Sequence, residues 1–319
     1  MLGKVLFAGD ANLDLVFSGL EKIPQEDKEI FCEGFTLTLG GSCTLTAAAY
    51  AHIGGSCDFC GLLGNDPNGD NVMKYLADAG VGLRLLRRQS SVNTGVTVNL
   101  VRAATRTQVT YPGCLAIVDE TEVILRDLSK YTHIHLSGIY GTIKFLPRIA
   151  EILLAARSAG VTTSMDTQWD SSEKWRFADE WLPLLTFLFV NEAEASSLAF
   201  QYGGQKKKEA GWKETWDCLR MLTVSPIIKL GPHGAYAGGK LYEPFRVEHV
   251  VDPTGAGDSF AAGFLYGIIE AGYDFNSAMW YAQAAGALAC SFEGGYSTEF
   301  TQGKVAATAQ QRLTKTGDN

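Results

Sequence analysis

The sequence predicts an α/β fold in which helices cover both faces of a doubly wound, mostly parallel sheet. Short apolar runs typical of buried strands alternate with longer segments of helical periodicity along most of the 319 residues. This alternation is the pattern of repeated strand–helix units. Polar residues follow several of the strands directly, as at Asp10 and Asp166. Ligands of such sheets bind at the carboxyl ends of the strands, so these positions are candidates for one shared site.

Each element follows from its local pattern. The predicted strands are residues 5–8, 30–39, 57–63, 81–86, 134–137, 161–165, 187–190, 226–230, 234–238 and 240–250. The predicted helices are residues 42–52, about 68–79, 146–159, 213–222, 260–269 and 276–291, with a last helix from about residue 298. Asp66-Pro67 suits a helix cap followed by proline at the first helical position.

Two β-rich segments fall outside this alternation. Residues 94–101 and 106–118 are β-rich runs around a short turn. Together with residues 15–39 they predict a small sheet that projects from the main domain and covers a cleft. We therefore expect one domain over residues 1–319, with a lid inserted from about 15–39 and 94–112. An antiparallel extension of the main sheet is the alternative, and periodicity does not choose between the two. A homodimer through the lid is expected, because dimerisation would cover its exposed edges and apolar face.

Composition narrows the class of protein. The chain is 46% hydrophobic and 19% charged, which is ordinary globular material. Its net charge of −8 argues against nucleic acid or an anionic membrane as the main partner. It has no apolar run of a length that could span a membrane. The seven cysteines are an odd number scattered along apolar segments, so we expect free thiols in a reducing cytoplasm.

The stretch from Val251 to Phe260 carries the clearest chemical signal. A β-type run over 245–251 ends there, Gly255-Ala256-Gly257 forms a turn, and a long apolar helix begins at once. A glycine turn at a helix N-terminus leaves backbone N–H groups free beside the positive end of the helix dipole, which makes an anion site. Asp258 lies in the first turn of that helix. Its carboxylate is either a helix-stabilising charge or a general base that deprotonates a hydroxyl beside a bound phosphoryl group.

Two well-known nucleotide-binding motifs are absent from the sequence. The chain has no G-x-x-x-x-G-K-[ST] loop, and no G-x-G-x-x-G follows the first strand. A P-loop protein and a dinucleotide-binding fold are therefore not supported.

Five motifs instead occur in a recognisable order. They are Gly40-Gly41, Gly64-x-Asp66-x-x-Gly69, Asn191-x-x-Glu194, Leu230-Gly231-x-x-Gly234 and the run from Asp252 to Asp258. In order and spacing they resemble the ribokinase-like, or PfkB, family of carbohydrate kinases, whose signature is D-T/P-T-G-A-G-D. The resemblance covers nearly the whole chain. It implies an ATP-dependent phosphotransferase that phosphorylates a hydroxyl of a small, non-phosphorylated sugar or sugar acid.

The resemblance also implies residue roles. Asp258 would be the catalytic base, and Gly255, Ala256 and Gly257 the anion hole. The acceptor would be bound by Asn12, Asp14, Gly40 and Gly41. ATP and Mg²⁺ would be bound by Asn191, Glu194, Lys229, Gly231, Gly234 and Thr254. Two carboxylates would help bind metal ions. Glu194 would belong to the Mg²⁺–phosphate network, and Asp252 stands at a position that helps hold a monovalent cation such as K⁺ in some members.

Three residues depart from the family pattern. Leu45 stands where many members have an asparagine that touches the sugar, which suggests less polar contact there. Asp170 stands where an arginine often reads a phosphate or carboxylate, so we expect an acceptor that is not already phosphorylated. Lys229 replaces a small hydroxyl residue. It either reaches a nucleotide phosphate or is a strand-end lysine that extends its ammonium to solvent.

Two other functions remain open at this point. A nucleoside kinase of the same fold would need an acceptor pocket lined for a base, and Leu45 leaves room for one. A non-catalytic sugar-binding regulatory protein is the second alternative. The intact Asp258 and the unbroken glycine turn speak against it, because both could drift freely in a protein that only binds.

Overall fold

The main body is a nine-stranded sheet in the computed structural model, which describes residues 3–102, 105–205 and 210–313. The strand order is β13-β12-β11-β10-β9-β8-β1-β4-β5. All neighbours from β11 to β5 are parallel, whereas β12 and β13 join as an antiparallel edge. The strands are β1 (Val5–Gly9), β4 (Cys57–Gly64), β5 (Gly82–Gln89), β8 (His133–Ser137), β9 (Thr162–Asp166), β10 (Phe187–Asn191), β11 (Ser225–Lys229), β12 (Ala235–Ala237) and β13 (Lys240–Tyr242).

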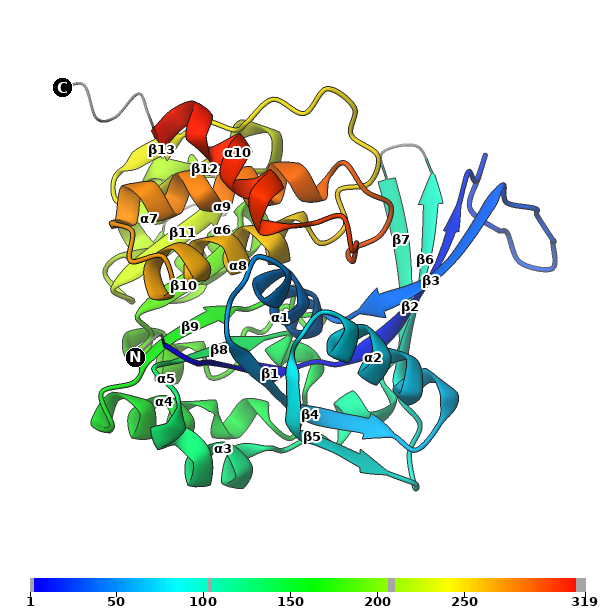
Figure 1. Ribbon diagram of the computed structural model, residues 1–319, viewed down its shortest axis with the longest axis horizontal. Helices are drawn as coiled ribbons and strands as arrows, with labels where there is room; N and C mark the ends of the chain where they lie inside the picture. Colours follow the sequence, from blue (N-terminus) through cyan, green and yellow to red (C-terminus); the bar gives the residue numbers. More distant parts are fainter. Residues whose placement is uncertain (1–2, 103–104, 206–209, 314–319) are drawn as a thin grey trace.

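Helices cover both faces of this sheet (Figure 1). One face carries α1 (Ser42–His52), α2 (Pro67–Asp78), α8 (Ala256–Ile269), α9 (Phe275–Ala289) and α10 (Gln302–Leu313). The other carries α3 (Thr121–Asp127), α4 (Ile149–Ser158), α5 (Ala178–Trp181), α6 (Glu192–Tyr202) and α7 (Trp212–Leu219). Alternate residues of one strand enter the two cores, as with Phe189 on one side and Leu188 on the other. The predicted doubly wound fold is confirmed.

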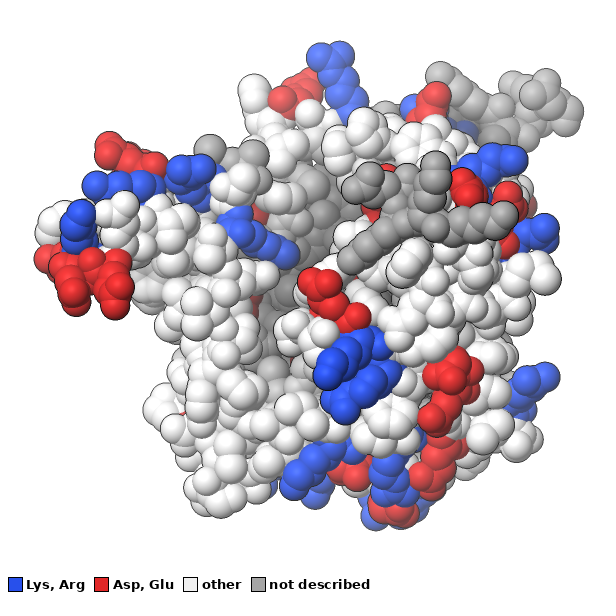
Figure 2. Space-filling view, turned by 180° about the vertical axis from the view of Figure 1, so that it is seen from behind, with Lys and Arg blue, Asp and Glu red and all other residues white. Residues whose placement is uncertain are grey.

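A separate four-stranded sheet projects from the body beside α2 (Figure 1). Its order is β3-β2-β6-β7, and its strands are β2 (Asn12–Ser18), β3 (Gly34–Gly40), β6 (Gly95–Arg102) and β7 (Thr105–Tyr111). Figure 2 shows it across a hollow from the body, with acidic and basic side chains gathered at its far end. The small sheet is thus distinct from the main sheet, as the fold prediction required.

Several predicted boundaries were wrong. The strand expected over 240–250 ends at Tyr242, and the β-type run expected over 245–251 forms no strand. Since β13 is the edge of the sheet, no further strand pairs with that segment, and Val250 is 61% exposed. The run expected over 106–118 stops at Tyr111, because Pro112 lacks the N–H that a strand would donate. A 3₁₀ turn, Gly113–Ala116, follows.

Parallel pairing brings the strand ends to one edge of the main sheet. Gly9, Ser137 and Asp166 are in register at the ends of β1, β8 and β9, and Asn191 is in register with Lys229 at the ends of β10 and β11. Within the described ranges, no helix is long and apolar enough to cross a membrane.

Candidate active site

The glycine turn before α8 forms a backbone cradle. Gly255 is the N-cap residue with a φ of 74°, a left-handed conformation that glycine adopts without strain. No side chain of the described residues caps this helix. The N–H of Ala256 donates to the carbonyl oxygen of Pro253 at 3.2 Å, and the helix geometry leaves the other first-turn N–H groups available to an anion. A Cβ at Gly255 would lie 2.7 Å from the Cα of Gly295, so the turn packs directly on that backbone.

Asp258 is buried beside this cradle and is 8% exposed. The Ser42 hydroxyl donates a hydrogen bond to its Oδ1. Burial, together with the negative charges of Asp166 and Asp10, raises the pKa of Asp258 to about 7. The charge of Lys229 and the Ser42 hydrogen bond oppose this shift. A carboxyl that titrates near neutrality is suited to take up a proton at physiological pH.

The predicted acceptor residues lie together where β2 meets β3. Asn12 Nδ2 donates to Asp14 Oδ1 at 3.2 Å and to Thr97 Oγ1 at 2.9 Å. A Cβ at Gly40 would overlap the Asp14 carboxylate, and Gly41 has a φ of 86°. Both glycines therefore permit a close approach that other residues would block. Burial raises the pKa of Asp14 to about 7.

Asn191 and Glu194 form a capping box at the start of α6. Glu194 N–H donates to Asn191 Oδ1 at 2.9 Å, and Asn191 N–H donates to Glu194 Oε2 at the same distance. This gives the motif a structural role, because it satisfies two N–H groups at the helix N-terminus. The capping box also holds the Glu194 carboxylate, which is 2% exposed, at the edge of the sheet where the parallel strands end. Burial raises the pKa of Glu194 to about 7.

The glycines after β11 shape a tight turn. Gly231 has a φ of 55° and Gly234 a φ of 92°. A Cβ at Gly234 would overlap the carbonyl oxygen of Tyr242, so this glycine is required by the turn into β12. A Cβ added at Gly231 would have no described atom within 4 Å, so Gly231 leaves open space at the end of β11.

Asp252 and Thr254 organise the loop before the cradle. One Asp252 oxygen accepts from the N–H of Thr254 at 2.8 Å and the other from the N–H of Gly294 at 3.0 Å. Asp252 therefore ties the cradle loop to the segment after α9. The Thr254 hydroxyl accepts from Arg106 Nη1 at 3.0 Å, and Arg106 lies on β7 of the small sheet.

Lys229 points inward rather than to solvent. Its ammonium pairs with Asp166, a partner that neither sequence interpretation included. Its side chain is 13% exposed, and that of Asp166 is fully buried. The lysine thus lies inside the candidate site rather than on the surface.

Sequence reasoning missed two side chains that the fold brings to this site, Ser42 and Arg106, whereas it did place Asp10 at the strand ends that form the site. Asp10 accepts from the N–H groups of Ser42 and Cys43 and so fixes the start of α1. One signal for Arg106 was present. Period-2 alternation over β7 places Arg106 on the same face as Gln108 and Thr110, and those two bond Asn99 and Thr97.

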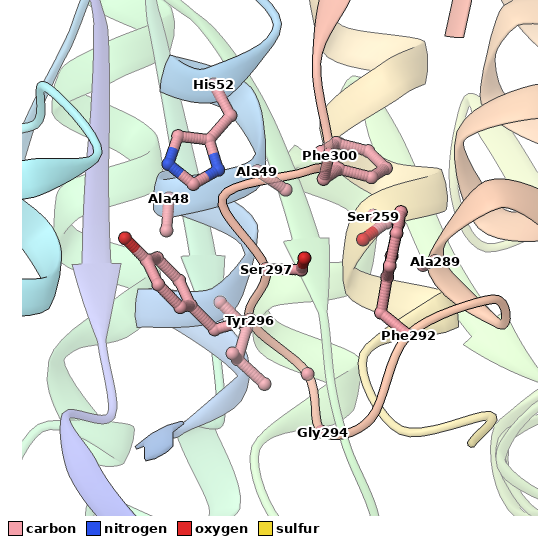
Figure 3. A pocket seen from close by; sticks show the side chains of 12 residues that line it. Ala48, Ala49, His52, Ser259, Ala289, Phe292, Gly294, Tyr296, Ser297 and Phe300 are labelled. Carbon is pink, nitrogen blue, oxygen red and sulfur yellow. The ribbon is translucent and has the colours of Figure 1, made fainter. Parts of the chain in front are cut away.

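Leu45 and Asp170 both have structural partners. A pocket adjoins the site between α1, α8, α9 and the segment after α9 (Figure 3), and Leu45 and Ser259 are among the residues that line it. Leu45 is 5% exposed and packs on Gly295. Asp170 accepts from the N–H groups of Ser172 and Trp175, so its carboxylate shapes its own loop.

Across the described residues, no group of three or more His, Cys, Asp or Glu side chains is arranged to hold a metal ion. In nucleotide sites Mg²⁺ is usually held by one or two carboxylates together with the phosphates, so no such group is required. Glu194 fits such a role, since its buried carboxylate lies at the same edge as the cradle.

Comparison with known proteins identifies the family. The family model described as pfkB family carbohydrate kinase matches residues 3–301. The ATP-dependent ribose-1-phosphate kinase of Halopiger xanaduensis is 30% identical over 97% of this chain and 99% of its own. The chain belongs to the pfkB family of carbohydrate kinases.

Other members resemble it over similar lengths. The aminoimidazole riboside kinase of Salmonella typhimurium is 29% identical over 92% of this chain and 91% of its own. A ribokinase from Cryptococcus neoformans, solved in complex with ADP, superposes with a TM-score of 0.77 at 25% identity over 96% of this chain and 99% of its own. This pfkB kinase is therefore an ATP-dependent phosphotransferase with a carbohydrate hydroxyl as acceptor, as the sequence predicted.

Proposed function

We propose that this pfkB kinase transfers the γ-phosphoryl group of ATP to a hydroxyl of a small, non-phosphorylated sugar or sugar acid, with Asp258 as general base. One observation carries the proposal. Ser42 follows the glycine pair Gly40-Gly41 directly and donates a hydrogen bond to Asp258. Ser42 therefore connects the glycine pair on the acceptor side directly to the proposed base.

The reaction needs positioning and charge stabilisation more than covalent chemistry. Asp14 and Asn12 hold acceptor hydroxyls, and Gly40 and Gly41 let the acceptor approach the backbone. Asp258 takes the proton from the attacking hydroxyl. The backbone turn of Gly255, Ala256 and Gly257 stabilises the charge on the transferred phosphoryl group through its available N–H groups.

The nucleotide lies along the ends of β10 and β11 in this proposal. Asn191 and Glu194 serve the Mg²⁺–phosphate network, while Gly231, Gly234 and Thr254 line the bound ATP. Mg²⁺ would neutralise charge on the phosphates when bound there. We propose Asp252 for a monovalent cation such as K⁺, since its carboxylate joins the two loops beside the cradle.

The small sheet acts as the lid and supplies the acceptor-binding face. Arg106 contacts the cradle loop, so its face of the sheet is the one turned to the main body. That face is polar and carries Asn12, Asp14, Thr97, Asn99, Gln108 and Thr110. Amides, hydroxyls and one carboxylate suit sugar hydroxyls, and the Asp14 carboxylate would repel a phosphate ester placed beside it.

A coupled ADP-release assay tests the acceptor class. The acceptors are ketoses, aldoses, sugar acids, inositol and nucleosides, with ribose 1-phosphate as the phosphorylated comparison, each with and without K⁺. We expect the highest kcat/KM with a non-phosphorylated sugar or sugar acid. A preference for the sugar phosphate would overturn that choice of acceptor.

Nucleosides remain the second candidate acceptors. Leu45 adds an apolar side chain on α1, the helix that follows Gly40-Gly41, and one relative is named for a riboside substrate. Higher kcat/KM with nucleosides than with any sugar would establish this alternative. Sugar binding without ADP release from any acceptor would instead indicate a protein that only binds.

We propose that the kinase is a homodimer through the lid. The outer face of the small sheet is apolar and carries Leu15, Phe17, Phe35, Leu37, Val98 and Val109. Phe35 is 58% and Val109 63% exposed, so a second copy would bury a large apolar surface. Sedimentation should give twice the 34.5 kDa chain mass, and Val109→Lys should give monomers. A monomeric wild-type protein at micromolar concentration would remove the dimer.

A cytoplasmic location is the remaining part of the proposal. All seven cysteines are free thiols, which suits a reducing compartment.

A further inference from the structure

Lys229 forms a buried ion pair across the end of a neighbouring strand. It ends β11, and its partner Asp166 ends β9. Strand β10 lies between them, with Asn191 in register with Lys229. The lysine side chain therefore crosses the end of β10 to reach a fully buried carboxylate. A buried charge is costly unless it is paired, so each partner requires the other.

The ammonium lies within a cluster of carboxylates. Burial lowers the pKa of Lys229, but the negative charges of Asp166, Glu194 and Asp258 outweigh burial and leave that pKa above its ordinary value. Asp10 adds a fourth negative charge, which acts on both Asp166 and Asp258. Buried carboxylates repel one another strongly because little water screens them. Lys229 offsets part of that repulsion.

The ammonium also packs beneath the cradle. A Cβ at Gly257 would lie 3.1 Å from Lys229 Nζ. Gly257 belongs to the first turn of α8, next to Asp258. The positive charge is therefore adjacent to the backbone N–H groups that are proposed to hold the phosphoryl group.

We infer that Lys229 is a positioning residue, an internal counter-charge that Asp166 holds beneath the cradle and that keeps Asp258 in the proton-accepting form. The inference rests on the proposed function, because it assigns Lys229 a role only through Asp258 as base. Lys229 then acts through Asp258 and need not touch ATP or the acceptor.

The pH dependence follows from the groups that face Asp258. Asp166 from β9 and Asp10 from the end of β1 raise its pKa, whereas Lys229 from β11 and the Ser42 hydroxyl from α1 lower it. A base must be deprotonated, so activity rises with pH through the pKa of about 7. Removing Lys229 raises that pKa and moves the acid limb of the pH–activity profile to higher pH.

The test compares pH profiles of kcat/KM for wild type, Lys229→Met, Asp166→Asn/Lys229→Met and a control, Lys144→Met, in which the changed side chain is exposed. Lys229→Met should shift the acid limb by about one pH unit, so activity below the limb falls about tenfold and recovers in alkali. The double variant also loses the Asp166 charge, so its limb should return toward the wild-type position. It also avoids leaving Asp166 unpaired if the single variant folds poorly.

Two outcomes overturn the inference. An unchanged acid limb in Lys229→Met would show that the pair is structural only. A loss at every pH that the double variant does not restore would show that Lys229 contacts the phosphoryl group itself. Carbon-13 NMR titration of the Asp258 carboxyl in the same proteins needs no turnover. It therefore tests the inference even if wild type phosphorylates no acceptor, a result that would instead refute the proposed function.

Discussion

Asp258→Asn should lower kcat by at least about 10²-fold while ATP binding survives, which is the range expected for loss of a general base. The asparagine side chain has nearly the same shape and keeps an oxygen for the Ser42 hydroxyl, but it cannot take up a proton. The cradle itself is backbone, so the anion site should remain. The measurements are steady-state kcat and ATP binding by calorimetry.

The matched control is Asp78→Asn. Asp78 is half exposed and pairs with Lys74 on the surface of α2, where such a pair contributes little. It should leave kcat and ATP affinity unchanged. If Asp258→Asn turned over within a few-fold of this control, Asp258 would be a helix-terminus charge and not the base.

Gly255→Ala should cost both stability and catalysis. A left-handed conformation costs a non-glycine residue about 1–2 kcal/mol. The added methyl group would also lie 2.7 Å from the Cα and 2.9 Å from the carbonyl oxygen of Gly295, and both of these atoms are backbone. The turn must therefore shift, which moves the N–H groups of the cradle. We expect kcat to fall by about 10²-fold, the scale of losing one donor from an anion hole.

The variant Gly160→Ala separates the cost of a left-handed backbone from the effect of moving the cradle. Gly160 has a φ of 71°, close to that of Gly255, but no described atom lies within 4 Å of its built Cβ. Thermal unfolding should therefore show a loss of stability in Gly160→Ala, while its kcat stays unchanged. Equal kcat in the two variants would mean that the turn before α8 tolerates displacement and is not an anion hole.

The sequence predicted elements wherever local pattern decides structure. Alternation gave the main sheet, and the glycine turn located the start of α8. Prediction from the sequence failed where the structure of a segment depends on a neighbouring element. Residues 245–251 have strand composition, but they lie beyond the sheet edge at β13, so they stay irregular. The helix α6 was missed because Asn191 and Glu194 were interpreted as a ligand motif, although they also form its capping box.

The site was predictable in its backbone motifs and less so in its side-chain partners. Strand ends indicated which residues would converge, because parallel strands end at one edge. They did not indicate that Lys229 would reach across β10 to Asp166. They also did not predict that Arg106 would contact Thr254, since 148 residues separate the two and the contact depends on how the small sheet folds over the body.

Phosphorus-31 NMR of the reaction mixture tests the central claim most directly. Wild-type protein with ATP, Mg²⁺ and the preferred acceptor of the ADP-release assay should give a new phosphomonoester signal as the γ-phosphate signal of ATP declines. Asp258→Asn should leave the ATP signals unchanged over the same time. Inorganic phosphate in place of the ester, or an equal ester signal from both proteins, would contradict phosphoryl transfer to a sugar hydroxyl with Asp258 as base.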